Sequence, residues 1–386
     1  MERKIKNVEG KEQKTQYFDY GLLAIVIFLV CFGLVMLYST SSYAGLEKFD
    51  DSMFFFKRQC RAALIGLVGM MFVSVLPYRK LYSKFAKLAY FASFGFLLLV
   101  WTPIGVEAYG ARRWISIPLF GTMQPAEITK LAIIIFIPLL ICKAGKSIKD
   151  IKVFMKIFAW GAVAAAGVFF ITDNLSSAII VMGIVCVMLF VAHPKTAPFI
   201  GIVAGAGALA LIAVRILDKM METSSDFRLR RILVWLHPEE YSADGGFQIM
   251  QGLYAIGSGG FFGKGLGNSA QKMVIPEVQN DMILSIICEE LGVFGAIVLL
   301  TLFGMLLYRL MFIAQNAPDM YGSLIVTGIF AHIALQVILN VCVVLNVIPT
   351  TGISLPFVSY GGTALVISMA ELGMALAVSR KIKFEE

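Results

Sequence analysis

Long apolar runs, separated by short polar segments, occupy most of the chain. Ten of them approach the length of about 20 residues that a helix needs to cross a bilayer. They lie at about residues 20–37, 62–76, 88–102, 128–142, 153–171, 177–192, 197–214, 282–307, 323–347 and 363–379. Backbone polar groups cannot face lipid unpaired, so these runs predict helices. The pattern predicts an all-α polytopic membrane protein with ten transmembrane helices, built as one domain over residues 20–383 after a polar, basic tail at 1–19.

The composition agrees with this prediction. Hydrophobic residues make up 59% of the chain and charged residues only 15%, which is too apolar for a soluble domain. The net charge of +8 is expected from membrane topology and does not indicate nucleic acid as a partner. The six cysteines have no paired spacing, so we expect packing residues and neither disulfides nor metal ligands. The first run is long enough to span and has no obvious cleavage site, so we expect a retained helix.

The basic residues predict the orientation in the membrane. They concentrate in the tail, in the second and fourth loops and after the last helix, which all fall on one side if ten helices are counted. The positive-inside rule makes that side cytoplasmic and places both termini on it. The segment 215–281, between the seventh and eighth helices, is then the longest loop on the extracytoplasmic side. Long loops without secondary structure are rare unless they are functional, so we expect short amphipathic helices in it.

Asp281 stands where this polar loop ends and the eighth apolar run begins. A carboxylate at that boundary can act on a substrate whose polar head lies in water and whose tail lies in the bilayer. The alternative is that Asp281, or Asn280 beside it, caps the helix. Glu289 and Glu290 lie about 12 Å further along the helix and on other faces, which argues against a two-carboxylate glycosidase site. We expect both glutamates to pair with polar groups inside the bundle.

Cationic residues near the same boundary are suited to bind an anionic head group. Glu127 and Lys130 share one face at the start of the fourth helix. They form either an ion pair that fixes the helix or part of a polar cavity in which Lys130 is available to a pyrophosphate. The remaining candidates either anchor the chain at the level of the lipid head groups or clamp an anionic head. They are Arg112, Arg113 and Trp114, and Arg231 in the segment 226–233.

Two segments rich in glycine or proline interrupt the helical pattern. Residues 257–267 contain many glycines but do not match a P-loop, so they are weak support for phosphate binding. Residues 349–362 cannot form a regular helix, so their backbone must be buried in protein or line a cavity. The three histidines form no ligand-like cluster, and we expect no metal site with protein ligands.

Four stretches resemble motifs of the SEDS family (shape, elongation, division and sporulation), which includes FtsW, RodA and SpoVE. The resemblance covers about residues 20 to 383. The most specific motifs are 257–292, which contains Asp281, and 355–362; the stretches 110–115 and 124–132 add to them. Residues 265–272 look more like FtsW and SpoVE than RodA. Residues 279–284 and 173–177 depart from the usual family residues, although Asp281 is kept.

The resemblance implies a peptidoglycan polymerase of the bacterial plasma membrane that uses lipid II, for cell division or for spore cortex or septal wall synthesis. It also implies a class B penicillin-binding transpeptidase as partner, together with other division or elongation membrane proteins. The family's essential aspartate falls on Asp281, its fourth-helix acid and base on Glu127 and Lys130, and its loop tryptophan on Trp114. Ser359 and Tyr360 of the last motif join the expected substrate-binding residues.

The expected reaction is glycosyl transfer. Asp281 accepts the proton of an acceptor hydroxyl, and undecaprenyl pyrophosphate leaves the donor sugar. Lys130, the loop arginines or a divalent cation (Mg²⁺ or Mn²⁺) held mainly by the substrate phosphates stabilise the leaving charge. Two alternatives stay open at this point: a transporter that flips lipid II across the membrane, and a non-catalytic scaffold for the transpeptidase.

Overall fold

The computed structural model describes residues 17–108, 111–117, 121–195, 200–201, 205, 227–241 and 245–383. Within these residues, nine helices are long and apolar enough to cross a membrane. They are α1 (Tyr20–Phe49), α2 (Phe54–Val75), α3 (Tyr78–Leu98), α4 (Pro125–Ala144), α5 (Ile151–Thr172), α6 (Leu175–Ala192), α10 (Ile283–Gln315), α11 (Met320–Val344) and α12 (Gly362–Ser379). Each overlaps a predicted run, which confirms the prediction of a polytopic helical membrane protein. Most of the predicted span at 197–214 lies outside the described residues.

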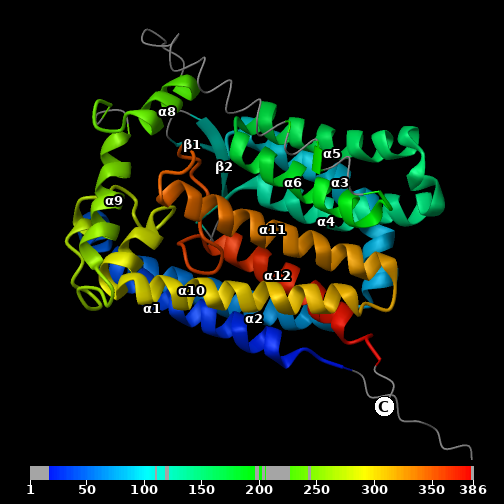
Figure 1. Ribbon diagram of the computed structural model, residues 1–386, viewed down its shortest axis with the longest axis horizontal. Helices are drawn as coiled ribbons and strands as arrows, with labels where there is room; N and C mark the ends of the chain where they lie inside the picture. The colour runs from blue at the N-terminus through cyan, green and yellow to red at the C-terminus, as the bar shows by residue number, and fades with distance from the viewer. Residues whose placement is uncertain are drawn as a thin grey trace, which may run out of the picture.

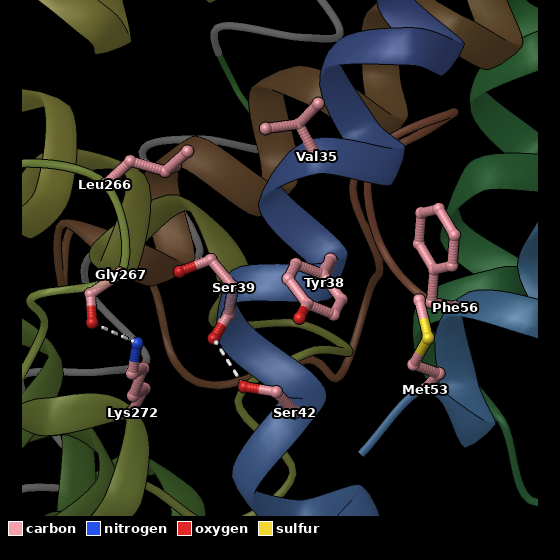
Figure 2. A pocket seen from close by; sticks show the side chains of 9 residues that line it. All are labelled: Val35, Tyr38, Ser39, Ser42, Met53, Phe56, Leu266, Gly267 and Lys272. Carbon is pink, nitrogen blue, oxygen red and sulfur yellow. Dashed lines mark hydrogen bonds between the residues drawn. The ribbon is translucent and has the colours of Figure 1, made fainter. Parts of the chain in front are cut away.

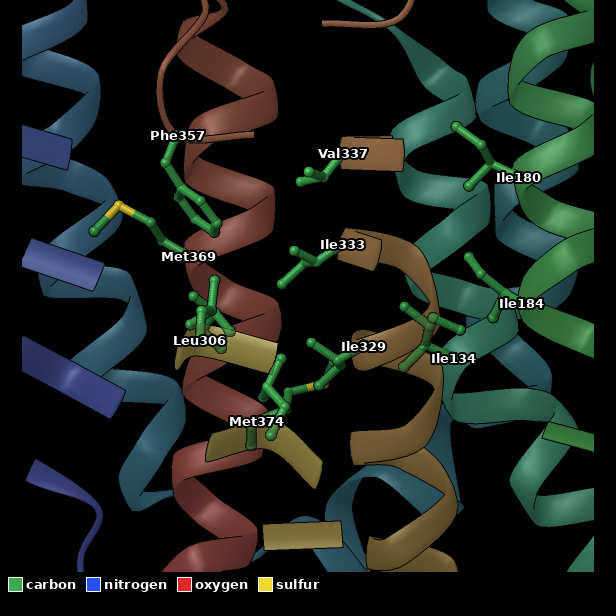
Figure 3. Packing of buried hydrophobic residues seen from close by; sticks show 14 of the residues in the cluster. Ile134, Ile180, Ile184, Leu306, Ile329, Ile333, Val337, Phe357, Met369 and Met374 are labelled. Atoms are coloured by element: carbon green, nitrogen blue, oxygen red, sulfur yellow. The ribbon is translucent and has the colours of Figure 1, made fainter. Parts of the chain in front are cut away.

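The long helices lie side by side along the longest axis of the molecule (Figure 1). The strands, α8, α9 and the segment between α11 and α12 gather at one end, on the left of that view, while α1 begins and α12 ends on the other side. The core contains buried apolar residues from α4, α6, α10, α11 and α12, and Figure 3 shows Ile134, Ile184, Leu306, Ile333 and Met369 among them. α11 is the most enclosed of the candidate spans. It is therefore the central element of the bundle.

Helix α1 is longer than its predicted run because its polar residues are satisfied within the fold. It has 30 residues and continues to Phe49, so it extends over about 45 Å, beyond the roughly 30 Å hydrocarbon layer. The hydroxyl of Thr40 donates to Met36 O at 2.9 Å, and that of Ser41 donates to Leu37 O at 2.6 Å. These bonds allow hydroxyl residues to be buried in a helix without an unpaired polar group.

A small antiparallel sheet occupies the loop between α3 and α4, which the sequence pattern did not predict. Its order is β1 (Gly105–Ala108), β2 (Ala111–Ile117) and β3 (Gly121–Met123). Ile115 and Met123 of this sheet are buried together with Val100. Three short strands give too little alternation of apolar and polar residues to stand out from a polar loop.

The described part of the long loop before α10 contains helices α8 (Phe227–Leu236) and α9 (Gly246–Gly259) and a 3-10 turn, η4 (Gln271–Met273). Short helices were expected here, and this expectation is confirmed. The segment 349–362 is also as expected, because it lacks helix up to Gly362, where α12 begins, and buries Leu355, Phe357 and Val358.

Helix α10 is broken at Gly292, and the glycine-rich segment enters the break. Gly292 has φ 69° and ψ −170°. The N–H groups of Val293 and Phe294 donate to the carbonyls of Gly260 and Phe261, both at 3.0 Å. The break therefore joins the two segments by backbone hydrogen bonds that an unbroken helix would not offer.

The two glutamates before this break are buried and paired, as expected. Glu289 accepts from Lys264 Nζ at 2.7 Å and also from Ser269. Glu290 accepts from Ser39 Oγ of α1 at 2.7 Å and pairs with Lys272 Nζ at 3.3 Å. These bonds tie the glycine-rich segment, α1 and α10 into one unit.

Far from this break, Asp19 connects the chain's first described residues to the bundle. It is fully buried, caps α1 by accepting from Leu22 N at 2.8 Å and pairs with Arg309 of α10 at 2.6 Å. Residues 1–16, which make up most of the predicted basic tail, lie outside the described residues.

We predict that Gly292→Ala lowers the unfolding temperature of the purified protein. A methyl group there would collide with the backbone of Phe261 and Gly263, and the positive φ costs about 1–3 kcal/mol for a residue with a side chain. Gly304→Ala is the matched control, because it lies in the same helix with nothing within 4 Å. It should be neutral or stabilising by up to about 1 kcal/mol. Equal effects of the two substitutions would contradict this account.

Candidate active site

The carboxylate of Asp281 is not used to cap α10. The helix begins at Ile283, its N-cap residue is Met282, and no side chain donates or accepts a capping hydrogen bond there. The alternative interpretation, in which Asp281 or Asn280 caps this helix, is therefore wrong. Asp281 is partly exposed, so its carboxylate remains available for another role.

The backbone around Asp281 is fixed by neighbouring elements. Asn340 of α11 donates through Nδ2 to the carbonyls of Asp281 and Ile353, both at 2.8 Å. This side chain thus joins the start of α10 to the segment 349–362. Gly352 of that segment lies beside the carboxylate, since a methyl group there would be 4.0 Å from Asp281 Oδ2. Asp281 is held at a junction of three parts of the chain.

Burial and nearby charges set the ionisation of Asp281. Burial raises its pKa above the usual range, and the negative charge of Glu277 raises it further. The positive charge of Arg231 on α8 acts in the opposite direction, as does the backbone N–H of Asp281 itself. Arg231 therefore favours the ionised form of a carboxylate that its surroundings would otherwise tend to neutralise.

Arg231 belongs to a larger charged cluster. Burial and the neighbouring Arg113 lower its pKa, while Asp281 and Asp173 raise it. Arg113 of β2 donates through Nη2 to the carbonyl of Asp173 at 2.9 Å. The structure thus brings Asp281, Arg231, Arg113 and Asp173 together from α10, α8, β2 and the corner between α5 and α6. We call these four residues the charged cluster.

The other predicted residues of β2 lie away from the charged cluster. Trp114 pairs with Val106 of β1 and Arg112 with Glu107, so Arg113 between them is the extra residue of a β-bulge. Arg112 forms an exposed ion pair with Glu107 of β1 at 3.4 Å. Trp114 is half-buried. Of this motif, the structure brings only Arg113 to Asp281.

Glu127 and Lys130 form a buried ion pair, in agreement with the first of the two interpretations above. Their Oε1 and Nζ atoms are 2.7 Å apart, and the Lys130 side chain is 1% exposed. The Lys130 ammonium group is therefore enclosed by protein and does not face an open cavity. Its predicted contact with substrate stays a prediction.

Ser359 and Tyr360 shape the segment 349–362. Ser359 Oγ accepts from Leu355 N at 2.8 Å, and its carbonyl accepts from Gln59 Nε2 of α2 at 3.2 Å. The Tyr360 ring packs edge-on against Phe55 at 5.0 Å, while its N–H donates to Gln279 O at 2.9 Å. These contacts hold the segment against α2 and against the turn that carries Asp281. A role in substrate binding stays a prediction for both residues.

Sequence reasoning did not assign Asp173 and Asn340 to the site. Asp173 lies between two apolar runs, where a polar residue is typical of any turn. Asn340 lies within an apolar run, and its position inside a membrane helix was the only available signal. Neither the contact with Arg113 nor that with the Asp281 carbonyl can be read from sequence spacing.

A cavity of about 580 Å³ lies elsewhere, between α1, the start of α2 and the glycine-rich segment (Figure 2). Its lining is largely apolar and includes Tyr38, Phe56, Leu266 and Lys272. Lys272 is already engaged there, because it donates to Gly267 O at 2.6 Å besides pairing with Glu290. The cavity contains none of the predicted site residues. Among the described residues, no group of three His, Cys, Asp or Glu side chains is arranged to hold a metal ion.

Comparison with known proteins identifies the family. The family model of the FtsW, RodA and SpoVE proteins, described as "Cell cycle protein", matches residues 20–383. This chain belongs to that family. The stage V sporulation protein E of Bacillus subtilis (strain 168) is 38% identical over 95% of this chain and 98% of its own length. A probable peptidoglycan glycosyltransferase FtsW of Geobacter sp. (strain M18) is 37% identical over 96% and 99%.

Solved structures of the family share this fold. One, described as "Structural coordination of polymerization and crosslinking by a peptidoglycan synthase complex", matches with a TM-score of 0.76 and 28% identity over 95% of this chain and 98% of that chain. The rod shape determining protein RodA of Thermus thermophilus matches with a TM-score of 0.65 and 26% identity over 95% and 97%. The family predicted from four sequence motifs is therefore confirmed.

We predict that Lys130→Met destabilises the protein by about 3–5 kcal/mol, because it leaves Glu127 buried without its counter-charge. The double variant Glu127→Gln/Lys130→Met should recover most of this loss, and thermal unfolding of the detergent-solubilised protein measures both. A double variant that is as unstable as the single one would contradict a role of the pair in stability. A stable double variant without activity would support the predicted contact with substrate.

Proposed function

We propose that this protein is a peptidoglycan glycosyltransferase that joins lipid II disaccharides into glycan strands and releases undecaprenyl pyrophosphate. The activity named for its FtsW relatives and their match over nearly the whole chain support this class of enzyme. The observation that carries the mechanism is the junction around Asp281. There, a carboxylate that caps no helix lies at the end of the bundle beside Arg231.

Asp281 is the proposed general base. Its carboxylate accepts the proton of the 4-hydroxyl of an acceptor N-acetylglucosamine. The freed oxygen forms a bond to C1 of the donor N-acetylmuramic acid, and the bond from C1 to the pyrophosphate oxygen breaks. The electron pair leaves with undecaprenyl pyrophosphate. A base must be ionised before it can accept a proton, so Arg231 supports the reaction by lowering the Asp281 pKa.

Arg113 and Arg231 are the proposed contacts for the pyrophosphate. Burial is the main cause of the lowered Arg231 pKa, and repulsion from the Arg113 guanidinium adds to it, so an anion between the two groups would relieve that repulsion. Guanidinium groups also match phosphate oxygens in geometry. Cations placed at the leaving group stabilise the charge that develops in the transition state.

A divalent cation, Mg²⁺ or Mn²⁺, is a further part of the proposal. Such an ion would take its ligands mainly from phosphate oxygens and water, and it would neutralise part of the leaving charge. The carboxylates of the charged cluster offer oxygen ligands of the type these ions prefer, although the residues described here form no dedicated protein site.

The alternative of a lipid II flippase has less support. Transport by alternating access requires the bundle to open toward each side in turn. The charged cluster lies at one end of the bundle, and toward the other end the buried pair of Asp19 and Arg309 fastens α1 to α10. The second alternative is a scaffold that only docks the transpeptidase. A scaffold would not need the Asp281 carboxylate, and burying that charge costs stability.

The proposed partner is a class B penicillin-binding transpeptidase, with other division or elongation proteins of the membrane. The solved relative that is described as a peptidoglycan synthase complex, which coordinates polymerization with crosslinking, supports this choice. The protein is a multi-pass membrane protein, and we propose cytoplasmic termini in the bacterial plasma membrane from the distribution of basic residues.

A lipid II polymerisation assay in proteoliposomes, with this chain alone and with its transpeptidase, separates the three functions. Glycan strands formed in either reaction support the polymerase. Transfer of labelled lipid II between leaflets without strand formation would favour a flippase. If neither activity is found under both conditions, the scaffold is favoured.

We predict that Asp281→Asn lowers the polymerisation rate by about 10²–10⁴-fold or more, which is the usual contribution of a general base. The unfolding temperature should not fall, because asparagine fills the same space and removes a desolvated charge. Glu107→Gln is the matched control, since that acid is exposed and pairs with Arg112 on the neighbouring strand. Full activity of Asp281→Asn would eliminate the proposed base.

A further inference from the structure

A line of buried polar side chains runs along α11 from the Asp281 junction into the middle of the bundle. Asn340, Gln336 and His332 follow one another at intervals of four residues, which places them on one face of the helix. All three are buried, and the helix is otherwise strongly apolar. At His332 the line reaches Glu371 of α12, whose Oε2 lies 2.7 Å from His332 Nδ1. We call these four side chains the polar column.

Each side chain of the polar column has one polar atom that is hydrogen-bonded to protein. Its other polar atom is buried and has no partner among the described residues. Asn340 Nδ2 is bound to the Asp281 and Ile353 carbonyls, and Gln336 Nε2 donates to Ser354 O at 3.1 Å. Within the part of the chain that the structure describes, no protein group bonds the remaining atoms. These atoms are Asn340 Oδ1, Gln336 Oε1, His332 Nε2 and Glu371 Oε1.

Unpaired polar atoms in a membrane interior are costly. Four of them in one line need an explanation, and water is the ligand that fits. Side chains four residues apart on a helix are separated by about 6 Å. One water molecule with a hydrogen bond of about 2.8 Å on either side bridges nearly that distance. Buried waters typically bind otherwise unsatisfied groups of this kind.

The far end of the polar column is closed by apolar packing. One turn beyond His332 lies Ile329, and one turn beyond Glu371 lies Met374, both buried in the hydrophobic core. Figure 3 shows these two side chains among the apolar residues that fill the space between α11 and α12. Among the described residues, this packing closes the far end, so water would enter the polar column from the end at which Asp281 lies.

We propose that the polar column holds a chain of water molecules that connects the Asp281 junction to the pair of His332 and Glu371. The pair carries one shared proton, because a carboxylate buried without a compensating charge would be far more costly. Through the chain of water, this proton exchanges with solvent at the Asp281 end of the bundle, as O–H and N–H bonds are broken and remade along the line. The proposal does not rest on the proposed glycosyltransferase activity.

Deuterium exchange at the C2 position of histidine tests this proposal, because that exchange requires water at the imidazole. The sequence has only three histidines, and His237 is exposed and serves as the internal reference. The full chain in nanodiscs is incubated in D2O, and exchange is measured by mass spectrometry of the His332 and His237 peptides. His332 should exchange measurably within the period in which His237 completes its exchange. If His332 does not exchange in that period, the proposal is overturned without any variant.

Gln336→Leu tests the direction of entry. It replaces the middle bridging group with an apolar side chain, so exchange at His332 should slow by at least about tenfold, while exchange at His237 stays unchanged. Ile333→Val, an apolar change three residues before Gln336 in the same helix, is the matched control and should leave both rates as they are. Unchanged exchange at His332 in Gln336→Leu would contradict entry along the polar column.

Discussion

The site depends on the attraction between Asp281 and Arg231 in surroundings that disfavour charge. A carboxylate that is freely solvated would be a weak base, and one that is buried without a cation would be neutral at physiological pH. Burial raises the Asp281 pKa and Arg231 lowers it, so the balance of the two determines how basic the ionised group is. The four elements that meet here, α8, α10, β2 and the corner between α5 and α6, are thereby linked through their charges.

The rest of the bundle keeps this junction in place by pairing the polar groups that it buries. Glu289 and Glu290 hold the glycine-rich segment against α10 and α1, and Asn340 holds the backbone at Asp281. Met282 is the N-cap residue of α10 and no side chain caps the helix, so Asp281 lies just before the helix begins. Asp281 is fixed through its main chain, while its carboxylate is left available for its proposed role as a base.

The amino-acid sequence was sufficient to locate the membrane-spanning helices that the structure describes, and it pointed to Asp281 as the main candidate. Apolar runs located the described spans because bilayer thickness imposes a length on them, and the charged residues within helices pointed to Glu127, Lys130 and the two adjacent glutamates. The sheet at 105–123 was missed because its strands are short. Asp173 and Asn340 were missed because their roles come from contacts between elements far apart in the chain. The burial of the Lys130 side chain could not be predicted either, because it depends on how the helices pack and not on residue spacing in the sequence.

The dependence of the polymerisation rate on pH, measured for the parent protein and for Arg231→Gln, tests the central claim most directly. With Asp281 as the proposed base, the rate should fall as pH falls through the Asp281 pKa, because only the ionised carboxylate accepts a proton. Removal of the Arg231 charge removes an influence that lowers this pKa, so the midpoint of the acidic limb should move to higher pH. Arg112→Gln, which changes an exposed arginine that pairs with Glu107, should leave the midpoint where it is. The same midpoint in Arg231→Gln and in the parent protein would contradict the electrostatic coupling on which this account rests.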